Sequence, residues 1–140
     1  MKRYRFNLEA VLQQRKLVYE QRAKDFVIAT NKLQLEQQRL ADINHRQRET
    51  ISAFNHKQRK GLTVRDSALY VSYLDRLAAE KKEQVSAVKA AEDRVSAARD
   101  VLNQARVRHE ILVKMKEKSR DQYDEIFKQE EQKFLDEITR

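Results

Sequence analysis

The side chains in this sequence that could do chemistry are three histidines and several paired carboxylates. His45, His56 and His109 lack the four-residue spacing that brings two metal ligands onto one face of a helix. With no cysteine in the chain, thiolate metal sites and disulfides are excluded. The carboxylate pairs near the C-terminus are Asp124 with Glu125, Glu130 with Glu131, and Asp136 with Glu137. We predict no catalytic residue, metal or cofactor, and we expect the carboxylates to lie on a solvated helix end or to bind a basic partner.

The elements that must position these side chains are helices. The 140 residues include no proline and one glycine, Gly61, and 37% of them are charged. Sheet domains and glycine-rich phosphate loops need many more turn residues, whereas the abundant Ala, Leu, Lys, Arg, Glu and Gln favour helices. A membrane span needs roughly 20 consecutive apolar residues, and no such run or apolar leader segment occurs. We therefore expect an all-α, cytoplasmic protein.

Heptad spacing predicts two long helices that form a coiled coil. In the first half, one column is apolar at six of seven positions, namely Leu12, Tyr19, Phe26, Leu33, Leu40, Gln47 and Phe54. Its companion column is interrupted by polar residues, namely Leu8, Arg15, Arg22, Ala29, Glu36, Ile43 and Thr50. The two columns of the second half are Val88, Val95, Leu102 and His109, and Ala91, Ala98, Ala105 and Leu112.

The turn between the helices is expected at Gly61, because glycine readily adopts the left-handed conformation that follows a helix. Thr63, Asp66 and Ser67 are each able to cap the second helix. We predict one antiparallel coiled-coil hairpin over residues 1–140. Its parts are a first helix over about 3–59, a turn over 60–66 and a second helix over about 67–137.

A hairpin with its tip near Leu62 matches large side chains with small ones across the seam. The pairs are Leu33 with Ala91, Phe26 with Ala98, and Tyr19 with Ala105, and Leu12 then meets Leu112. Even packing across a seam favours such pairs, whereas a parallel dimer would stack each residue on its own copy. In this register residue 1 lies opposite residue 123, so residues 124–140 overhang.

The net charge of +8 comes from the first half of the chain. Residues 1–60 hold 14 basic and 6 acidic side chains, whereas residues 61–140 hold 16 of each. This surplus fits a solvated helix face, an acidic partner or nucleic acid. Nucleic acid is disfavoured because no aromatic side chains alternate with the basic ones, and a membrane surface is disfavoured because the apolar seam is narrow.

The start of the second helix carries more apolar side chains than a seam can bury. They are Leu69, Tyr70, Val71, Tyr73, Leu74 and Leu77. The seam columns continue through Tyr70, Leu74 and Leu77. Leu69 and Tyr73 lie outside these columns, and Val71 lies partly outside them. Two interpretations stay open: local packing on Phe54 and Leu62, or a partner-binding patch.

The segment Tyr4–Leu12 resembles the N-terminal F-x-L-x-x-V-L pattern of the FliJ family of flagellar export proteins, through Phe6, Leu8, Val11 and Leu12. The central glycine, the run Leu69-Tyr70-x-x-Tyr73-Leu74-x-x-Leu77 and the acidic C-terminal helix are also similar to that family. The resemblance implies a two-helix coiled coil similar to the stalk subunit of rotary ATPases. It also implies a non-enzymatic component of the type III export apparatus, held at the inner membrane through its partners.

The partners that the resemblance implies are the export ATPase hexamer, the cytoplasmic domain of the export gate and some export chaperones. The implied gate surface is Tyr70, Tyr73, Leu74 and Leu77, and Glu80 and Lys81 depart from the small or neutral residues usual beside it. For the ATPase ring we expect contacts from Lys2, Arg3, Arg5, Asp124, Glu125, Glu130 and Glu131. Two alternatives remain: a generic or nucleic-acid-associated coiled coil, and the equivalent stalk of a virulence secretion system.

Overall fold

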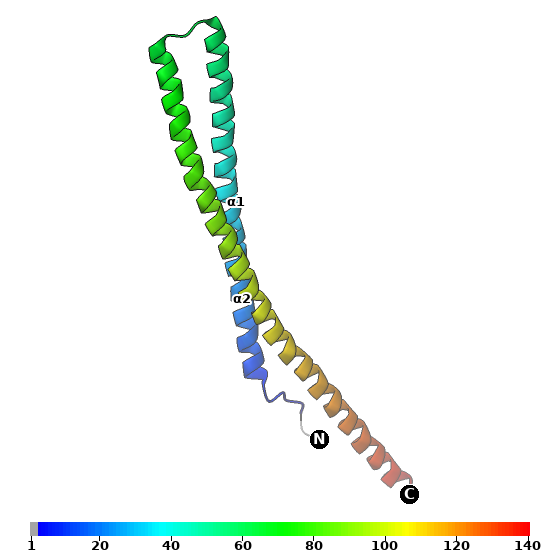
Figure 1. The fold of residues 1–140 in the computed structure, drawn as a ribbon. Helices are drawn as coiled ribbons and strands as arrows, with labels where there is room; N and C mark the ends of the chain where they lie inside the picture. Colours follow the sequence, from blue (N-terminus) through cyan, green and yellow to red (C-terminus); the bar gives the residue numbers. More distant parts are fainter. Residues whose placement is uncertain (1–2) are drawn as a thin grey trace. The chain divides into compact units, whose positions relative to one another are not determined.

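The computed structural model describes residues 3–140, which form two long α-helices joined by a short loop (Figure 1). Helix α1 spans Glu9–Lys60 and helix α2 spans Val64–Thr139, and no strand occurs within 3–140. The all-α, antiparallel two-helix fold predicted from the heptad columns is confirmed. None of the helices described over these residues is both long enough and apolar enough to cross a membrane.

The chain divides into two compact units. Unit 1 contains Met1–Lys24 and Asp100–Arg140, and unit 2 contains Asp25–Arg99. Helices α1 and α2 contribute to both units, and within each unit the two segments run antiparallel.

The loop of unit 2 covers residues 61–63 and is shorter than the predicted turn. Gly61 has a φ of 92°, the left-handed conformation in which a side chain would be strained. Of the three candidate caps, Thr63 accepts a hydrogen bond at Oγ1 from the backbone N–H of Asp66 (3.2 Å). Because Thr63 supplies the cap, α2 begins at Val64, ahead of the predicted start.

The first helix also begins later than predicted, at Glu9 instead of near residue 3. The difference has a packing cause, because Tyr4 and Phe6 both contact the same side of α2. Residues two apart share a side of an extended chain but point to different faces of a helix. Residues 3–6 are therefore not helical, and a turn at Asn7 and Leu8 leads into α1.

The seam of unit 2 follows the predicted columns. Its buried side chains are Glu36, Ile43, Leu77, Ala91 and Val95. Near the loop, the rings of Phe54 and Tyr70 lie 5.2 Å apart, and these residues are equally distant along the chain from Leu62. The predicted register is therefore confirmed in this unit.

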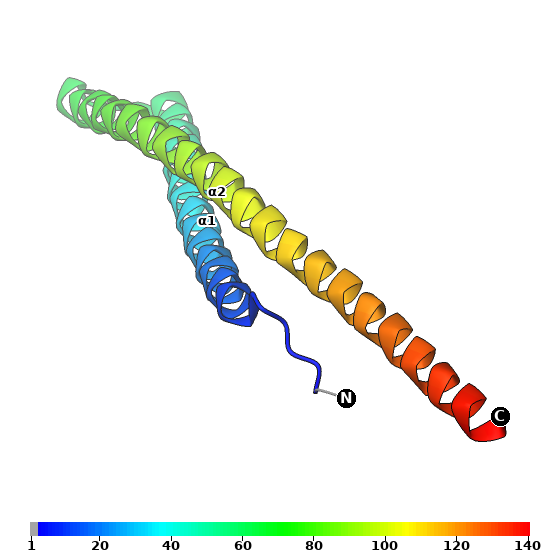
Figure 2. The same ribbon diagram turned by 90° about the horizontal axis from the view of Figure 1, so that it is seen from below.

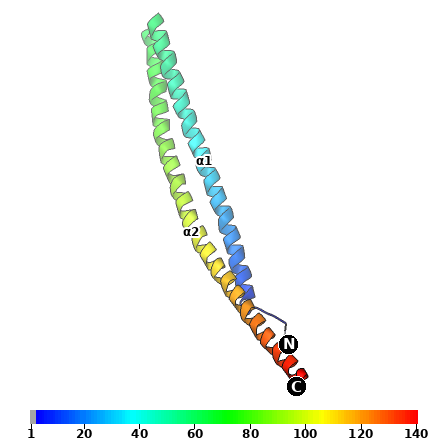
Figure 3. The ribbon, with the colours of Figure 1, turned by 90° about the vertical axis from the view of Figure 1, so that its right-hand side faces the viewer.

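The seam of unit 1 has the same register. One buried cluster contains Phe6, Leu12 and Leu112, and the two leucines are again equally distant from Leu62. Ala105, one heptad before Leu112, is also buried. The rings of Tyr19 and His109 lie 5.5 Å apart. Past the N-terminal end of α1, α2 continues as a single helix (Figures 2 and 3). Every residue of 124–140 is exposed, as expected for the predicted overhang.

Candidate partner-binding surfaces

The first candidate surface lies on unit 2, at the start of α2. Leu69, Val71 and Tyr73 are 63%, 48% and 38% exposed, and we call these three residues the tip surface. They occupy the positions that the heptad columns leave outside the seam. Neighbouring large apolar side chains on a rigid helix are typical anchors for a partner protein.

The other three predicted gate residues are covered by the hairpin itself. Tyr70 is half-buried against Phe54, with Lys57 Nζ 5.5 Å from the centre of its ring, and Leu74 is half-buried. Leu77 is only 1% exposed and is the most completely buried large side chain of the described residues. Leu77 therefore lies in the seam, because it is one heptad after Tyr70 and faces α1, and its part in a gate contact stays a prediction.

Glu80, which departs from the family's usual residues beside this surface, has a partner across the helix pair. Its Oε1 lies 3.3 Å from Nη2 of Arg46. The pKa of Arg46 is raised, first by the hydrogen bond to Glu80 and further by a hydrogen bond to Tyr73. Arg46 thus pairs with Glu80 across the two helices and places a charge near Tyr73 of the tip surface.

The second candidate surface is the C-terminal tail, which we define as residues 124–140 of α2. Large apolar side chains are exposed along it, namely Ile126, Phe127, Phe134, Leu135 and Ile138. The predicted ring-contact residues Asp124, Glu125, Glu130 and Glu131 are all exposed here. An amphipathic helix with no partner of its own is suited to docking on another protein.

The basic residues predicted to share this end with the tail lie on the N-terminal segment. Arg3 and Arg5 are exposed, and Lys2 lies outside the described residues. Between the two arginines, Tyr4 donates a hydrogen bond from its hydroxyl to the backbone carbonyl of Lys116 (3.3 Å). The segment is therefore held beside α2, close to where the tail begins.

We call the contact of Tyr4 and Phe6 with α2 the N-terminal clasp. The rings of Tyr4 and Tyr123 are 5.3 Å apart, and the guanidinium of Arg120 lies 4.8 Å from the centre of the Tyr4 ring. Such a cation–π contact contributes about 0.5–1 kcal/mol at an exposed site. The clasp closes the seam of unit 1 at the point where α2 continues alone.

An ion pair lies beside the clasp. Lys116 Nζ is 2.8 Å from Oε2 of Glu9, the first residue of α1. The hydrogen bond from Lys116, with a second from Gln13, lowers the pKa of the Glu9 carboxyl. A carboxylate in the first turn also interacts favourably with the helix dipole.

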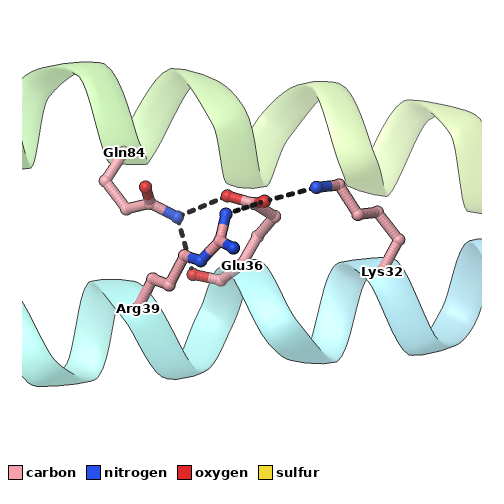
Figure 4. Close-up of polar contacts among 4 residues, drawn as sticks. All are labelled: Lys32, Glu36, Arg39 and Gln84. Atoms are coloured by element: carbon pink, nitrogen blue, oxygen red, sulfur yellow. Dashed lines mark hydrogen bonds and ion pairs between the residues drawn. The ribbon is translucent and has the colours of Figure 1, made fainter.

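A buried glutamate interrupts the apolar seam of unit 2. Glu36 is 5% exposed, and its Oε1 lies 2.9 Å from Lys32 Nζ and 3.0 Å from Arg39 Nη1 (Figure 4). From α2, Gln84 donates to Glu36 Oε2 (2.6 Å) and to the backbone carbonyl of Glu36 (2.9 Å). The pKa of Glu36 is lowered, first by Lys32 and then by Gln84. A buried charge with this many partners specifies one register of the two helices.

Sequence reasoning missed two of these features, although each had a signal. Glu36 stood out as a polar residue in a seam column, but its partner Gln84 lies on the other helix. Tyr4 and Phe6 are apolar at a spacing of two, which does not suit a helix. Within residues 3–140, no three histidine or carboxylate side chains lie close enough together to hold a metal ion.

The fold and these surfaces define a two-helix coiled-coil protein with exposed apolar surfaces on its second helix. Residues 4–140 match the family described as Flagellar FliJ protein, and the chain belongs to this family. This match confirms the resemblance drawn from the N-terminal pattern, the central glycine, the Leu69–Leu77 run and the acidic C-terminal helix. FliJ-family proteins are non-enzymatic components of the flagellar type III export apparatus.

Among solved structures, the chain is similar to CT670 from Chlamydia trachomatis, which is described as a YscO homolog. The identity is 24% and the TM-score is 0.43, over 91% of this chain and 83% of that chain. No curated protein sequence matches.

Proposed function

We propose that this chain couples the export ATPase ring to the export gate without catalysing a reaction of its own. The observation that carries the proposal is the C-terminal tail, in which five large apolar side chains are exposed on a helix that the rest of the fold leaves unpaired. Membership of the FliJ family supports a role in the export apparatus. In this proposal, the tail and the exposed Arg3 and Arg5 contact the ring.

A thin helical element can influence a ring of six ATPase subunits because it cannot contact all six in the same way. Contacts on some subunits favour nucleotide binding at those subunits. A helical element that binds the assembled ring, and not the separate subunits, also stabilises the ring by mass action. The tail offers apolar side chains and carboxylates, while Arg3 and Arg5 offer positive charge. Both signs of charge are therefore available for the lining of the ring.

The tip surface is the proposed contact for the cytoplasmic domain of the export gate. Leu69, Val71 and Tyr73 are exposed while the seam beneath them is packed, so a partner can bind them without opening the hairpin. Export chaperones are further proposed partners, as the family resemblance implies.

A pull-down from cell lysate tests the gate contact. The intact chain is compared with a Leu69→Ala, Tyr73→Ala variant, which removes two tip side chains and leaves the seam intact. The matched control is Val85→Ala, another exposed apolar residue of α2 within unit 2 (49% exposed). We expect the wild-type chain and the control to recover the gate domain from the lysate, and the tip variant not to recover it. Equal recovery by all three proteins would refute the gate contact.

A further inference from the structure

A groove of about 460 Å³ runs between the two helices of unit 1. Its walls are made of arginine, glutamine and small apolar side chains, namely Gln14, Arg15, Val18, Arg22, Val101, Gln104, Ala105 and Arg108. Ala105 is buried, while Val18 and Val101 remain 41% and 42% exposed. The groove, which we call the arginine groove, thus combines an apolar floor with a basic rim.

Three arginines give the rim of the groove its positive charge. Arg15 and Arg22 are one heptad apart on α1, and Arg108 comes from α2. Neither Arg15 nor Arg108 forms an ion pair within residues 3–140, and no carboxylate is among the described residues that line the groove. Because guanidinium groups pair with carboxylates in a bidentate geometry, the groove suits a helix with carboxylates beside an apolar stripe.

The C-terminal tail of the same chain has this pattern. Phe127, Phe134 and Ile138 share one helix face, since they are spaced by seven and four residues. Carboxylates flank this face on both sides, Glu130 and Glu137 on one and Asp124 and Glu131 on the other. Each flanking pair has the seven-residue spacing of Arg15 and Arg22. Residues 121–140 hold seven acidic and three basic side chains, so the charges are complementary.

We infer that the C-terminal tail of one copy docks in the arginine groove of a second copy, where it adds a third helix to the local pair. The tail cannot reach the groove of its own chain, because α2 is unbroken from Val64 to Thr139 and contains neither glycine nor proline. The small side chain of Ala105 lets the incoming helix approach closely. The phenylalanine rings of the tail then cover Val18 and Val101.

The arrangement closes into a dimer. When the α2 helices of two copies run antiparallel, the groove of each lies beside the tail of the other, so both contacts form about a two-fold axis. The dimer covers both tails. The regulatory consequence rests on the proposed function: self-association and binding to the ATPase ring compete for the tail.

Charge exchange between two variants of the full chain tests this dimer. The groove variant carries Arg15→Glu and Arg108→Glu, and the tail variant carries Glu130→Arg and Glu131→Arg. Each variant alone places like charges in both contacts, whereas a mixture of the two restores opposite charges in both. Sedimentation velocity over a concentration series measures the mass, and circular dichroism checks that each variant keeps its helicity.

We expect the wild-type chain to form a dimer whose fraction rises with concentration and falls with salt. Each variant alone should dimerise at least ~10-fold more weakly, and the equimolar mixture should recover the dimer. A wild-type chain that stays monomeric, a dimer that neither variant weakens, or a mixture that does not recover would each overturn the inference. No ATPase is present in the assay, so its failure is distinct from failure of the proposed function.

Discussion

Unit 2 and unit 1 close the same kind of helix pair in different ways. In unit 2 the seam is filled from the two helices alone, with Leu77 almost completely buried. In unit 1 the cluster of Leu12 and Leu112 is completed by Phe6, which comes from a segment outside the helices. The surfaces left for partners differ accordingly: the tip surface lies beside a complete seam, whereas the C-terminal tail lies beyond the end of one.

The largest effect on stability is expected from Leu77→Ala in unit 2. Removal of a fully buried leucine leaves a cavity and lowers the free energy of unfolding by about 2–5 kcal/mol. Tyr73→Ala, four residues away and partly exposed, is the matched control and should cost about 1 kcal/mol or less. Urea unfolding followed by circular dichroism measures both. If the two variants were equally stable, Leu77 would not be a seam residue.

A smaller effect is expected from Phe6→Ala in unit 1, although phenylalanine is the larger side chain. The N-terminal clasp is a terminal segment that can open locally, so the loss in unfolding free energy is limited to about 1–2 kcal/mol. Hydrogen exchange should show faster exchange around Leu112, with the amides near Leu77 unchanged. Arg5→Ala, an exposed neighbour, is the control and should change neither. Equal acceleration at Leu77 would mean that the clasp supports both seams.

The smallest effect concerns pH and contrasts the buried Glu36 of unit 2 with the more exposed Glu9 of unit 1. The pKa of each is lowered from an ordinary value of 4.5, so the folded state favours the ionised form. The stability that each contributes is therefore present above pH 4.5 and is lost as the pH falls through the lowered value. The difference in melting temperature between wild type and Glu36→Gln should shrink as the solution is acidified below pH 4.5.

Glu9→Gln is the matched control for that experiment. Its effect should also disappear in acid, but it should be weakened more strongly by added salt, because the Glu9–Lys116 pair is partly exposed to solvent. If salt reduced the effect of Glu36→Gln as strongly, Glu36 would not be shielded within the seam.

Much of the fold could be predicted from the sequence, because heptad spacing and a single glycine determine where two long helices pair and turn. The columns also identified Leu77 as a seam residue, and its burial in the structure confirms that position. The clasp could not be predicted in the same way. Burial of Tyr4 and Phe6 depends on a surface that exists only once α2 has packed on α1.

The candidate surfaces were predictable only in part. The exposure of Leu69 and Tyr73 follows from their places outside the columns, and the exposed tail follows from the register. The arginine groove could not be predicted, because side chains of both helices line it. In the sequence, Arg15 and Arg22 are recognisable only as polar interruptions of a seam column. Similarly, the hydrogen bonds from Gln84 to Glu36 depend on side-chain positions that heptad spacing does not specify.

The central claim is that the tip surface and the C-terminal tail make separate contacts, and a crossed assay tests it most directly. A chain lacking residues 124–140 and the Leu69→Ala, Tyr73→Ala variant are each measured for stimulation of the export ATPase and for binding to the gate domain. We predict that the truncated chain loses ATPase stimulation and keeps gate binding, and that the tip variant does the reverse. A truncated chain that loses gate binding while it still stimulates the ATPase would contradict this assignment of the two surfaces.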